Sequence, residues 1–410
     1  MKILVVTQYF WPENFRINDL VLGLKAKGHD VVVLTGIPNY PEGRFFTGYG
    51  FFKKRFEYYK GIKVFRAPLL PRGKSRGWRL SLNYLSFALF ASFLAPIYCR
   101  GKFDVIFVFQ TSPITVGIPA IVLKRLKRVP IMLWVLDLWP ESLSATGAVK
   151  SSQVLHLVEY LVRFIYHQCD YILVSSKGFI PNVKLMAGAA KKICYFPNWA
   201  EELYQPAWLN KEFEETKGIP TGFRIMFAGN IGAAQDFGTI LAAAEKLKDY
   251  EDIHWLILGD GRMFDWVKKS VETRGLTSRV HLLGRYPPEA MPHFFSMADV
   301  MLVSLRRDLI FALTVPGKLQ SYMACGKPII AALDGEGGRL VAESGAGLAC
   351  PSGNPDALAK TILTVYNTPK SELENMGLRG RSYYEKHFER SMLINKLERW
   401  MQRIKGKGKY

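Results

Sequence analysis

Short apolar runs alternate with amphipathic stretches along almost the whole chain. Near the start, apolar runs at 3–6 and 31–34 flank the stretch 17–24, in which apolar residues recur at helical spacing. Two short runs joined by a helical stretch predict a β–α–β unit. Further strands are predicted at 63–66, 105–109, 131–135 and 171–174. This alternation is typical of a doubly wound parallel sheet in an α/β fold.

The pattern pauses in the polar stretch 201–216 and restarts at 223–228. From there it predicts strands at 253–258, 280–283, 300–304 and 329–332, with helices such as 239–247 and 264–274 between them. A chain of 410 residues is too long for one compact core, so we expect two α/β domains. The predicted parts are an N-terminal domain 1–198, a C-terminal domain 199–370, C-terminal helices 371–404 and a basic tail 405–410.

Positive charge changes this picture because it is concentrated in one segment. The formal net charge is +20, and segment 44–102 alone holds thirteen Lys or Arg against the single acid Glu57, which is 13 minus 1, or +12. Such an excess implies an anionic partner, which is a nucleic acid, a phosphorylated substrate or a membrane surface. No nucleic-acid-binding motif accompanies the charge, so we expect no nucleic-acid partner.

Segment 80–99 is apolar, rich in aromatic residues and flanked by basic residues on both sides. Asn83 and Pro96 interrupt it, and the two basic flanks give no orientation bias, which is atypical of a membrane span. We predict a helix that packs on the N-terminal domain and dips one face into the membrane interface. Segment 44–102 is therefore the predicted membrane-facing part of that domain.

The expected location is the cytoplasm, with peripheral attachment to the inner face of the cell membrane. The chain begins on a strand without a signal peptide, and its five scattered cysteines lack the spacing of metal ligands. An odd number of dispersed cysteines is typical of a reducing compartment.

The stretch 315–328 carries the strongest candidate chemistry. It follows the predicted strand 300–304, and its Pro-Gly pair suits the first turn of a helix. Free amides at a helix start attract anions, and Lys318 would add a full positive charge beside them. The other interpretation is an ordinary helix start with a solvated lysine. The candidate phosphate-binding residues are Pro316, Gly317, Lys318, Leu319, Gln320 and Ser321.

Other loops at predicted strand ends of the same domain fit a nucleotide pocket. Glycines in the loop after 223–228 permit close backbone approach to a phosphate, although a simple turn would look the same. Arg285 is equally compatible with a surface position. The further candidates for nucleotide-sugar binding are Gly229, Asn230, Gly232, Gln235, Gly259, Arg285 and Tyr286.

In the first domain, Asp137 follows the strongly apolar run 131–135 and lies beside Trp139. A carboxylate at the carboxyl end of a strand can position a sugar hydroxyl or accept its proton, so Asp137 is the candidate catalytic residue. Glu141 is interpreted as a stabilising acid in the first turn of a helix that begins after Pro140.

Several chemistries lose their usual signals in this sequence. The loop after the first strand lacks the Gly-x-Gly-x-x-Gly of dinucleotide binders, and we predict no cofactor. No Asp-x-Asp occurs and the seven histidines form no ligand pair, so we expect no metal.

These motifs resemble retaining glycosyltransferases of family 4, which have the GT-B fold of two facing Rossmann-like domains with a cleft between them. The resemblance covers almost the whole chain and is greatest to the branch of bacterial surface-polysaccharide assembly that includes O-antigen N-acetylfucosamine transferases. The motifs that carry it lie at 9–14, 28–29, 137–141, 229–232 and 322–328.

The resemblance implies transfer from a nucleotide sugar bound by the C-terminal domain. UDP is expected ahead of GDP as the nucleotide, and an N-acetylated deoxy sugar is one candidate for the transferred group. It implies a polyprenyl-diphosphate-linked saccharide acceptor on the N-terminal domain, near Asn14 and Arg16, and retention of configuration without a metal. Two alternatives stay open at this point: a nucleotide-sugar epimerase of the GT-B fold and a non-enzymatic polyanion-binding protein.

The chain departs from the family pattern at charged positions. The two family glutamates fall on Leu313 and Ser321, and the Arg and Lys that often bind the diphosphate fall near Asn230 and Gln235. We therefore expect Lys318 and the helix-start amides to carry more of the diphosphate charge.

Overall fold

The computed structural model describes residues 1–73, 77–145, 147, 149, 151–188, 192–207 and 218–405. It divides the chain into two compact units. The first unit is Met1–Pro197 with Ser391–Tyr410, and the second is Asn198–Arg390. The predicted boundary after residue 198 lies one residue from this division. The C-terminal helices, which we expected to form a separate part, are instead shared between the two units, and the predicted tail lies outside the described residues from 406 onward.

The first unit is built on an eight-stranded sheet in the order β3-β4-β2-β1-β5-β6-β7-β8. Neighbouring strands are parallel, except for the antiparallel pair β3 and β4 at one edge. The strands are β1 (Lys2–Thr7), β2 (Asp30–Gly36), β3 (Phe56–Tyr59), β4 (Ile62–Ala67), β5 (Val105–Gln110), β6 (Ile131–Val135), β7 (Tyr171–Val174) and β8 (Lys192–Tyr195).

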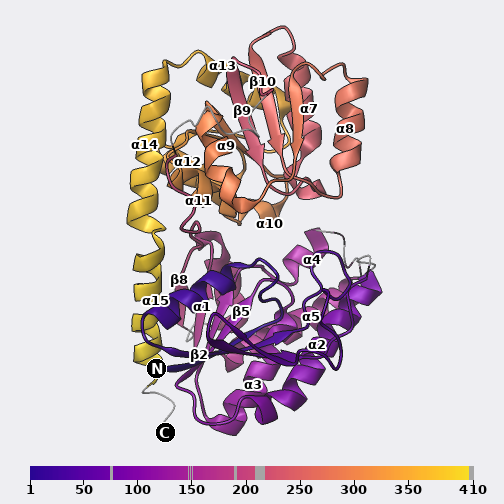
Figure 1. The fold of residues 1–410 in the computed structure, drawn as a ribbon, viewed down its shortest axis with the longest axis vertical. Coiled ribbons are helices and arrows are strands. Elements are labelled where there is room, and N and C mark those ends of the chain that lie inside the picture. Colours follow the sequence, from indigo (N-terminus) through magenta and orange to yellow (C-terminus); the bar gives the residue numbers. More distant parts are fainter. Residues whose placement is uncertain are drawn as a thin grey trace. The chain divides into compact units, whose positions relative to one another are not determined.

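Helices cover the sheet of the first unit. Helices α2, α3 and α5 pack one against the next on one side of it (Figure 1). The helices are α1 (Arg16–Ala26), α2 (Gly77–Tyr98), α3 (Gly117–Lys127), α4 (Glu141–Ala145), α5 (Ser152–Gln168), α6 (Ile180–Ala187) and α15 (Arg390–Lys405), with 3-10 turns η1 (Ile114–Val116) and η2 (Lys177–Phe179).

The second unit contains a six-stranded parallel sheet in the order β11-β10-β9-β12-β13-β14. Its strands are β9 (Phe223–Ala228), β10 (Ile253–Leu258), β11 (Val280–Gly284), β12 (Val300–Ser304), β13 (Ile329–Ala332) and β14 (Gly347–Cys350). Its helices are η4 (Ala233–Gln235), α7 (Phe237–Lys246), α8 (Phe264–Thr273), η5 (Pro288–Ala290), α9 (Met291–Met297), α10 (Leu309–Ala312), α11 (Gly317–Ala324), α12 (Gly335–Ser344), α13 (Pro355–Tyr366) and α14 (Lys370–His387).

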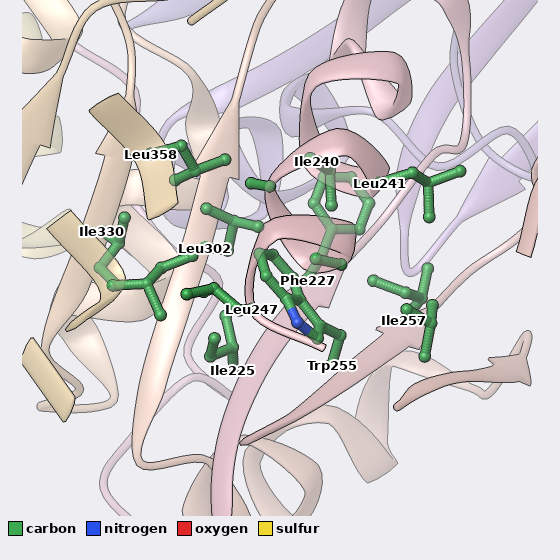
Figure 2. Packing of buried hydrophobic residues seen from close by; sticks show 14 of the residues in the cluster. Ile225, Phe227, Ile240, Leu241, Leu247, Trp255, Ile257, Leu302, Ile330 and Leu358 are labelled. Atoms are coloured by element: carbon green, nitrogen blue, oxygen red, sulfur yellow. The ribbon is translucent and has the colours of Figure 1, made fainter. Parts of the chain in front are cut away.

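The core of the second unit explains why its strands are largely apolar. Figure 2 shows Phe227 and Trp255 of neighbouring strands packed beneath Ile240 of α7. Leu358 of α13 covers another part of the same face. A parallel sheet is covered on both faces, so strand residues pointing either way must be apolar. This buried scaffold fixes the strand ends from which the site loops leave.

The predicted α/β class and the predicted parallel strands are confirmed, and six predicted strands have the bounds seen in the structure. Three strands were missed: β3, β8 and β14. All three lie at the edge of a sheet, and polar or glycine residues interrupt their apolar runs.

Candidate functional site

Three loops of the second unit converge at the carboxyl ends of β9, β10 and β12. Gly229 follows β9 with φ +133°, and a Cβ added there would lie 2.7 Å from Cε and 3.0 Å from Nζ of Lys318. A Cβ added at Gly259, after β10, would clash with the carbonyl oxygen of Gly229. Only glycine suits both positions, because φ is positive and no room exists for a side chain. The two glycines therefore let the backbone approach Lys318 closely.

The ammonium group of Lys318 is the central feature of this convergence. Its Nζ is buried, makes no hydrogen bond within the part of the chain that the structure describes, and lies 3.4 Å from the ring centroid of Phe227. Burial lowers the pKa of Lys318 to about 7. A buried ammonium that lacks acceptors is costly, whereas a diphosphate would supply them. The position fits an anion site better than a solvated lysine.

Lys318 is the second residue of helix α11. Pro316 is its N-cap residue, and no side-chain hydrogen bond caps the helix start. Gly317 is exposed, and no atom lies within 4 Å of where its Cβ would be. An uncapped helix start next to a lysine offers amide donors to an anion.

The remaining predicted residues of α11 are less available. The Leu319 side chain packs in the core, so only its backbone remains for a nucleotide. Gln320 is buried, and its amide, oriented to satisfy both of its atoms, donates to the Pro316 carbonyl at 3.0 Å. The Ser321 hydroxyl donates to the Gly317 carbonyl at 3.4 Å. These contacts stabilise the first turn of α11, so the Gln320 and Ser321 side chains are used within the helix.

The loop after β9 is closed on itself by Gln235. Its Oε1 accepts from the Gly232 amide at 3.1 Å and from Asn230 Nδ2 at 3.3 Å. A Cβ added at Gly261 would lie 2.8 Å from Asn230 Oδ1, so the loop after β10 also packs against this loop. Asn230 and Gln235 thus shape the loop but bring no positive charge to it.

A cavity of about 430 Å³ opens at the end of β11. It is lined by Tyr204, Arg285, Tyr286, Pro287, Pro288 and Met291. The Tyr286 ring packs against Phe294 with centroids 4.5 Å apart, and Arg285 is exposed. Aromatic and proline walls beside an arginine suit a planar base. Sequence reasoning missed Tyr204, which lies in a polar stretch without periodic signal.

In the first unit, Asp137 lies at the carboxyl end of β6 as predicted. The polar side chains of Ser142, Ser112 and Trp139 lie near its carboxylate and act to lower its pKa. Burial raises the pKa of Asp137 to about 6, and the nearby charge of Glu141 adds to that rise. With this pKa the carboxylate is mostly ionised at neutral pH, so it can orient a sugar hydroxyl by accepting a hydrogen bond from it.

Glu141 is the first residue of α4, as its interpretation required. Its side chain nevertheless turns inward: Oε1 accepts from Asn182 Nδ2 at 3.1 Å, while Oε2 is buried without a partner among the described residues. The sequence contained no signal for this orientation, because Asn182 lies 41 positions away.

The two predicted acceptor-binding residues lie where the loop between β1 and α1 ends. Asn14 is exposed, and Arg16 is the first residue of α1. Between β1 and α1, the buried Glu13 accepts hydrogen bonds from the backbone amides of Asn39 and Tyr40, both at 2.8 Å. Burial raises the pKa of Glu13 to about 7. The loop is thus well positioned, while contact of Asn14 and Arg16 with an acceptor stays a prediction.

Two protein-family models match the chain. The model for a glycosyl transferase 4-like domain matches residues 14–199, and the model for glycosyl transferases group 1 matches residues 210–383.

Two curated relatives and one solved structure illustrate the similarity. The glycosyltransferase WbjE of Pseudomonas aeruginosa is 29% identical over 274 residues, which cover 64% of this chain and 66% of WbjE, just under two thirds. WcaI of Escherichia coli strain K12, described as a colanic acid biosynthesis glycosyl transferase, is 26% identical over 340 residues, or 80% of this chain and 82% of WcaI. The crystal structure of Anabaena HepE with UDP aligns with a TM-score of 0.70 at 16% identity, covering 98% of this chain and 100% of HepE.

Two parallel-sheet domains with these matches define a glycosyltransferase of the GT-B fold. More narrowly, the chain is a GT-B glycosyltransferase of the family 4 type. It is therefore a transferase, and neither the epimerase nor the non-enzymatic alternative is retained.

Proposed function

We propose that this protein is a retaining, metal-independent glycosyltransferase of surface-polysaccharide assembly. The donor is a UDP-linked sugar, with an N-acetylated deoxy sugar as the expected group, and the acceptor is a polyprenyl-diphosphate-linked saccharide. The carrying observation is the buried, unpartnered Lys318 ammonium beside the glycine loops and the α11 start. The complex of HepE with UDP and the name of WcaI favour the same donor class and process.

In this proposal Lys318 and the first amides of α11 stabilise the departing diphosphate. Negative charge develops on the leaving oxygen as its bond to the anomeric carbon breaks, and preorganised donors are most effective there. The acceptor oxygen forms its bond to the anomeric carbon on the same face. Asp137 orients the acceptor hydroxyl, whose proton passes to the departing phosphate oxygen.

We further propose that α2 attaches the protein to the inner face of the cell membrane. Within the described part of the chain, α2 is the one helix whose length and composition would suit a membrane span. Its inner face, including Ala88, Ala91 and Ala95, is buried against the unit, which favours lying in the interface over crossing. The exposed apolar residues recur every three or four positions: Trp78, Leu82, Leu85, Leu89, Phe93 and Ile97.

Helix α5, which packs on α3 in the same layer, also exposes apolar side chains. Leu157, Tyr160 and Phe164 are exposed on it, which sequence reasoning had not singled out. Arg79 lies in the first turn of α2 and Arg100 follows two positions after its end, and this charge is complementary to anionic lipid headgroups.

The function is tested by a donor screen against polyprenyl-diphosphate saccharides, with UDP- and GDP-linked sugars offered in parallel. We expect transfer from a UDP-sugar with retained configuration that persists in EDTA. Lys318→Ala should lower kcat/KM by about a hundredfold or more, the usual effect of removing a donor to developing charge. Lys268→Ala, an exposed lysine on α8, serves as the matched control. Near-normal transfer by Lys318→Ala would contradict the proposal.

A further inference from the structure

A half-buried arginine lies among aromatic rings at the carboxyl-end edge of the sheet in the first unit. Arg72 Nη1 donates to the Tyr9 hydroxyl at 3.0 Å. The Arg72 guanidinium lies 5.0 Å from the ring centroid of Tyr40 and 5.7 Å from that of Tyr9. Tyr9 follows β1, Tyr40 follows β2 and Arg72 follows β4. These three strands are parallel neighbours, so the sheet brings the three side chains together.

Hydrogen bonds to the backbone hold this arginine in place. The Arg72 amide donates to Asn39 Oδ1 at 3.2 Å, and the same oxygen accepts from Asn83 Nδ2 of α2 at 3.3 Å. The amides of Asn39 and Tyr40 both donate to the buried Glu13 carboxylate at 2.8 Å. Because the backbone of both Arg72 and Tyr40 is fixed, the guanidinium is positioned before any ligand binds, which lowers the entropic cost of binding.

Most of the hydrogen-bonding capacity of this guanidinium is unused. A guanidinium carries five N–H donors. Arg72 Nε is buried without a partner, and no carboxylate pairs with Arg72 within the ranges that the structure describes. Arg66 of β4 shows the opposite arrangement. It is fully buried and donates to Glu57 Oε1 at 2.6 Å and to the carbonyl oxygens of Gly36 and Trp11. Arg66 is thus used within the fold, whereas Arg72 has donors left for a ligand.

A second arginine adjoins the same turn. A Cβ added at Gly73, the residue after Arg72, would lie 2.9 Å from both Cδ and Nη1 of Arg79. Arg79 is exposed and lies in the first turn of α2. Its guanidinium lies 5.2 Å from the ring centroid of Trp78. Two guanidinium groups beside one turn suit an anion that carries more than one negative charge, such as a diphosphate.

This turn lies between the predicted acceptor loop and the proposed membrane helix. Phe15 stacks on Tyr9 with ring centroids 5.0 Å apart, and it lies inside the segment 14–16 that is predicted to bind the acceptor. On the other side, Arg72 precedes Gly77, the first residue of α2, by five positions. A lipid-linked acceptor spans the same interval, because its tail lies in the membrane, its diphosphate at the depth of the headgroups and its saccharide in the site.

We propose that Arg72, with Arg79 beside it, binds the diphosphate of the lipid-linked acceptor. The identity of the lipid as the acceptor rests on the proposed function, whereas the preference for a diphosphate does not. A guanidinium can donate two parallel hydrogen bonds to one phosphate, so two neighbouring guanidinium groups favour a diphosphate over a headgroup with a single phosphate. General attraction to anionic headgroups is the alternative, and lipids with one and two phosphates distinguish the two.

The test compares binding of the full chain to two kinds of phosphatidylcholine vesicle, which carry either polyprenyl diphosphate or phosphatidylglycerol at equal surface charge. In flotation assays the wild type should bind the diphosphate vesicles about tenfold more tightly. Arg72→Gln should lose most of this preference and keep its binding to phosphatidylglycerol. Arg100→Gln removes an exposed positive charge just after α2, so it is the matched control and should keep the preference.

Arg79→Gln covers the case in which Arg72→Gln folds poorly, because Arg79 is exposed, and it should lower the preference by about threefold. Equal binding of the two vesicles by the wild type would overturn the proposal. So would an unchanged preference in folded Arg72→Gln, or in Arg79→Gln where the first variant does not fold. An equal loss of binding to both vesicles would assign the arginines to general headgroup binding and would also overturn it.

A transfer assay separates this proposal from the proposed function. For Arg72→Gln we expect KM for a polyprenyl-diphosphate saccharide to rise by about tenfold, with kcat and KM for the donor unchanged. An unmoved KM for this acceptor would refute the diphosphate site and leave the proposed function intact. A vesicle preference that depends on Arg72, in a wild type that transfers no sugar, would refute the proposed function but not the diphosphate site.

Discussion

At the scale of single residues, the donor site depends on the close packing of a lysine and two glycines. The Lys318 ammonium is buried against Phe227 with no compensating acceptor in the described structure, and it can lie there only because residue 229 lacks a side chain. Gly259 in turn leaves room for the Gly229 backbone. A folded protein rarely retains such an arrangement unless a ligand repays it.

Gly229→Ala tests the close approach. The added Cβ would meet Lys318 Cε at 2.7 Å and would strain a backbone with φ +133°, so we expect affinity for UDP to fall by about tenfold or more. Gly238→Ala is the control, because its Cβ would meet only Asp236 Oδ1 at an ordinary 3.7 Å. Titration calorimetry with UDP measures both, and equal affinities for the two variants would argue against the convergence at Lys318.

The depressed pKa of Lys318 predicts a pH dependence of stability. Its folded pKa, about 7, lies below the unfolded value, so the unfolded chain binds the extra proton between the two. Relative to Lys318→Met, the wild type should be least stable at low pH and should recover as pH rises above 7. Urea unfolding at pH 7 and pH 9.5 checks this. A difference in the free energy of unfolding between the two proteins that is the same at both pH values would contradict it.

At the scale of secondary-structure elements, α2 has two faces with different surroundings. Its buried face carries Asn83, Tyr84 and alanines that fit closely against the unit, while its outer face exposes Leu85, Leu89 and Phe93. An exposed apolar stripe of this length next to basic residues is typical of a membrane-binding helix.

Replacing the outer face tests its role. The double variant Leu89→Ser with Phe93→Ser should lose most of its binding to vesicles that contain anionic lipid, because each side chain would otherwise bury apolar surface in the interface. Leu309→Ser with Leu378→Ser, which alters two equally exposed leucines of the second unit, should bind as the wild type does. Flotation assays compare the two, and similar binding by both would remove α2 from the interface.

The sequence predicted elements well where burial imposed a simple pattern. Strands such as β6 and β13 are apolar on both faces, so short continuous runs marked them. Strand β3 at a sheet edge mixes Glu57 with aromatic residues, and β14 begins with Gly347, so neither gave a run. The β-propensity of the residues cannot identify a strand that forms mainly because it pairs with a neighbouring strand.

The sequence predicted which strand-end loops form the site, but it did not predict the distances between their residues. Lys318 and Gly229 were identified separately, yet the distance between them depends on how β9 and β12 pair. Arg72 donates a hydrogen bond to the Tyr9 hydroxyl across 63 positions in sequence, and no local pattern encodes such a contact. Gln320 shows the converse, since a polar residue expected to meet a nucleotide is used to brace its own helix.

At the scale of the whole molecule, each unit has its own sheet and core, and every predicted donor-binding residue lies in Asn198–Arg390. A donor nucleotide should therefore stabilise the second unit selectively. Hydrogen exchange with saturating UDP should slow for amides of the β9 and β10 loops and α11, while β5 and β6 of the first unit stay unchanged. Equal protection of both units, or protection of the first alone, would contradict this assignment.

The most direct test of the central claim is calorimetric titration of UDP at pH 8 in two buffers with different ionisation enthalpies. Lys318 has a pKa of about 7 without a ligand, and an adjacent diphosphate would favour its charged form. The account predicts that UDP binds with uptake of a proton by the wild type, and that Lys318→Met binds weakly without this uptake. Absence of UDP and GDP binding, or the same proton uptake in Lys318→Met, would contradict it.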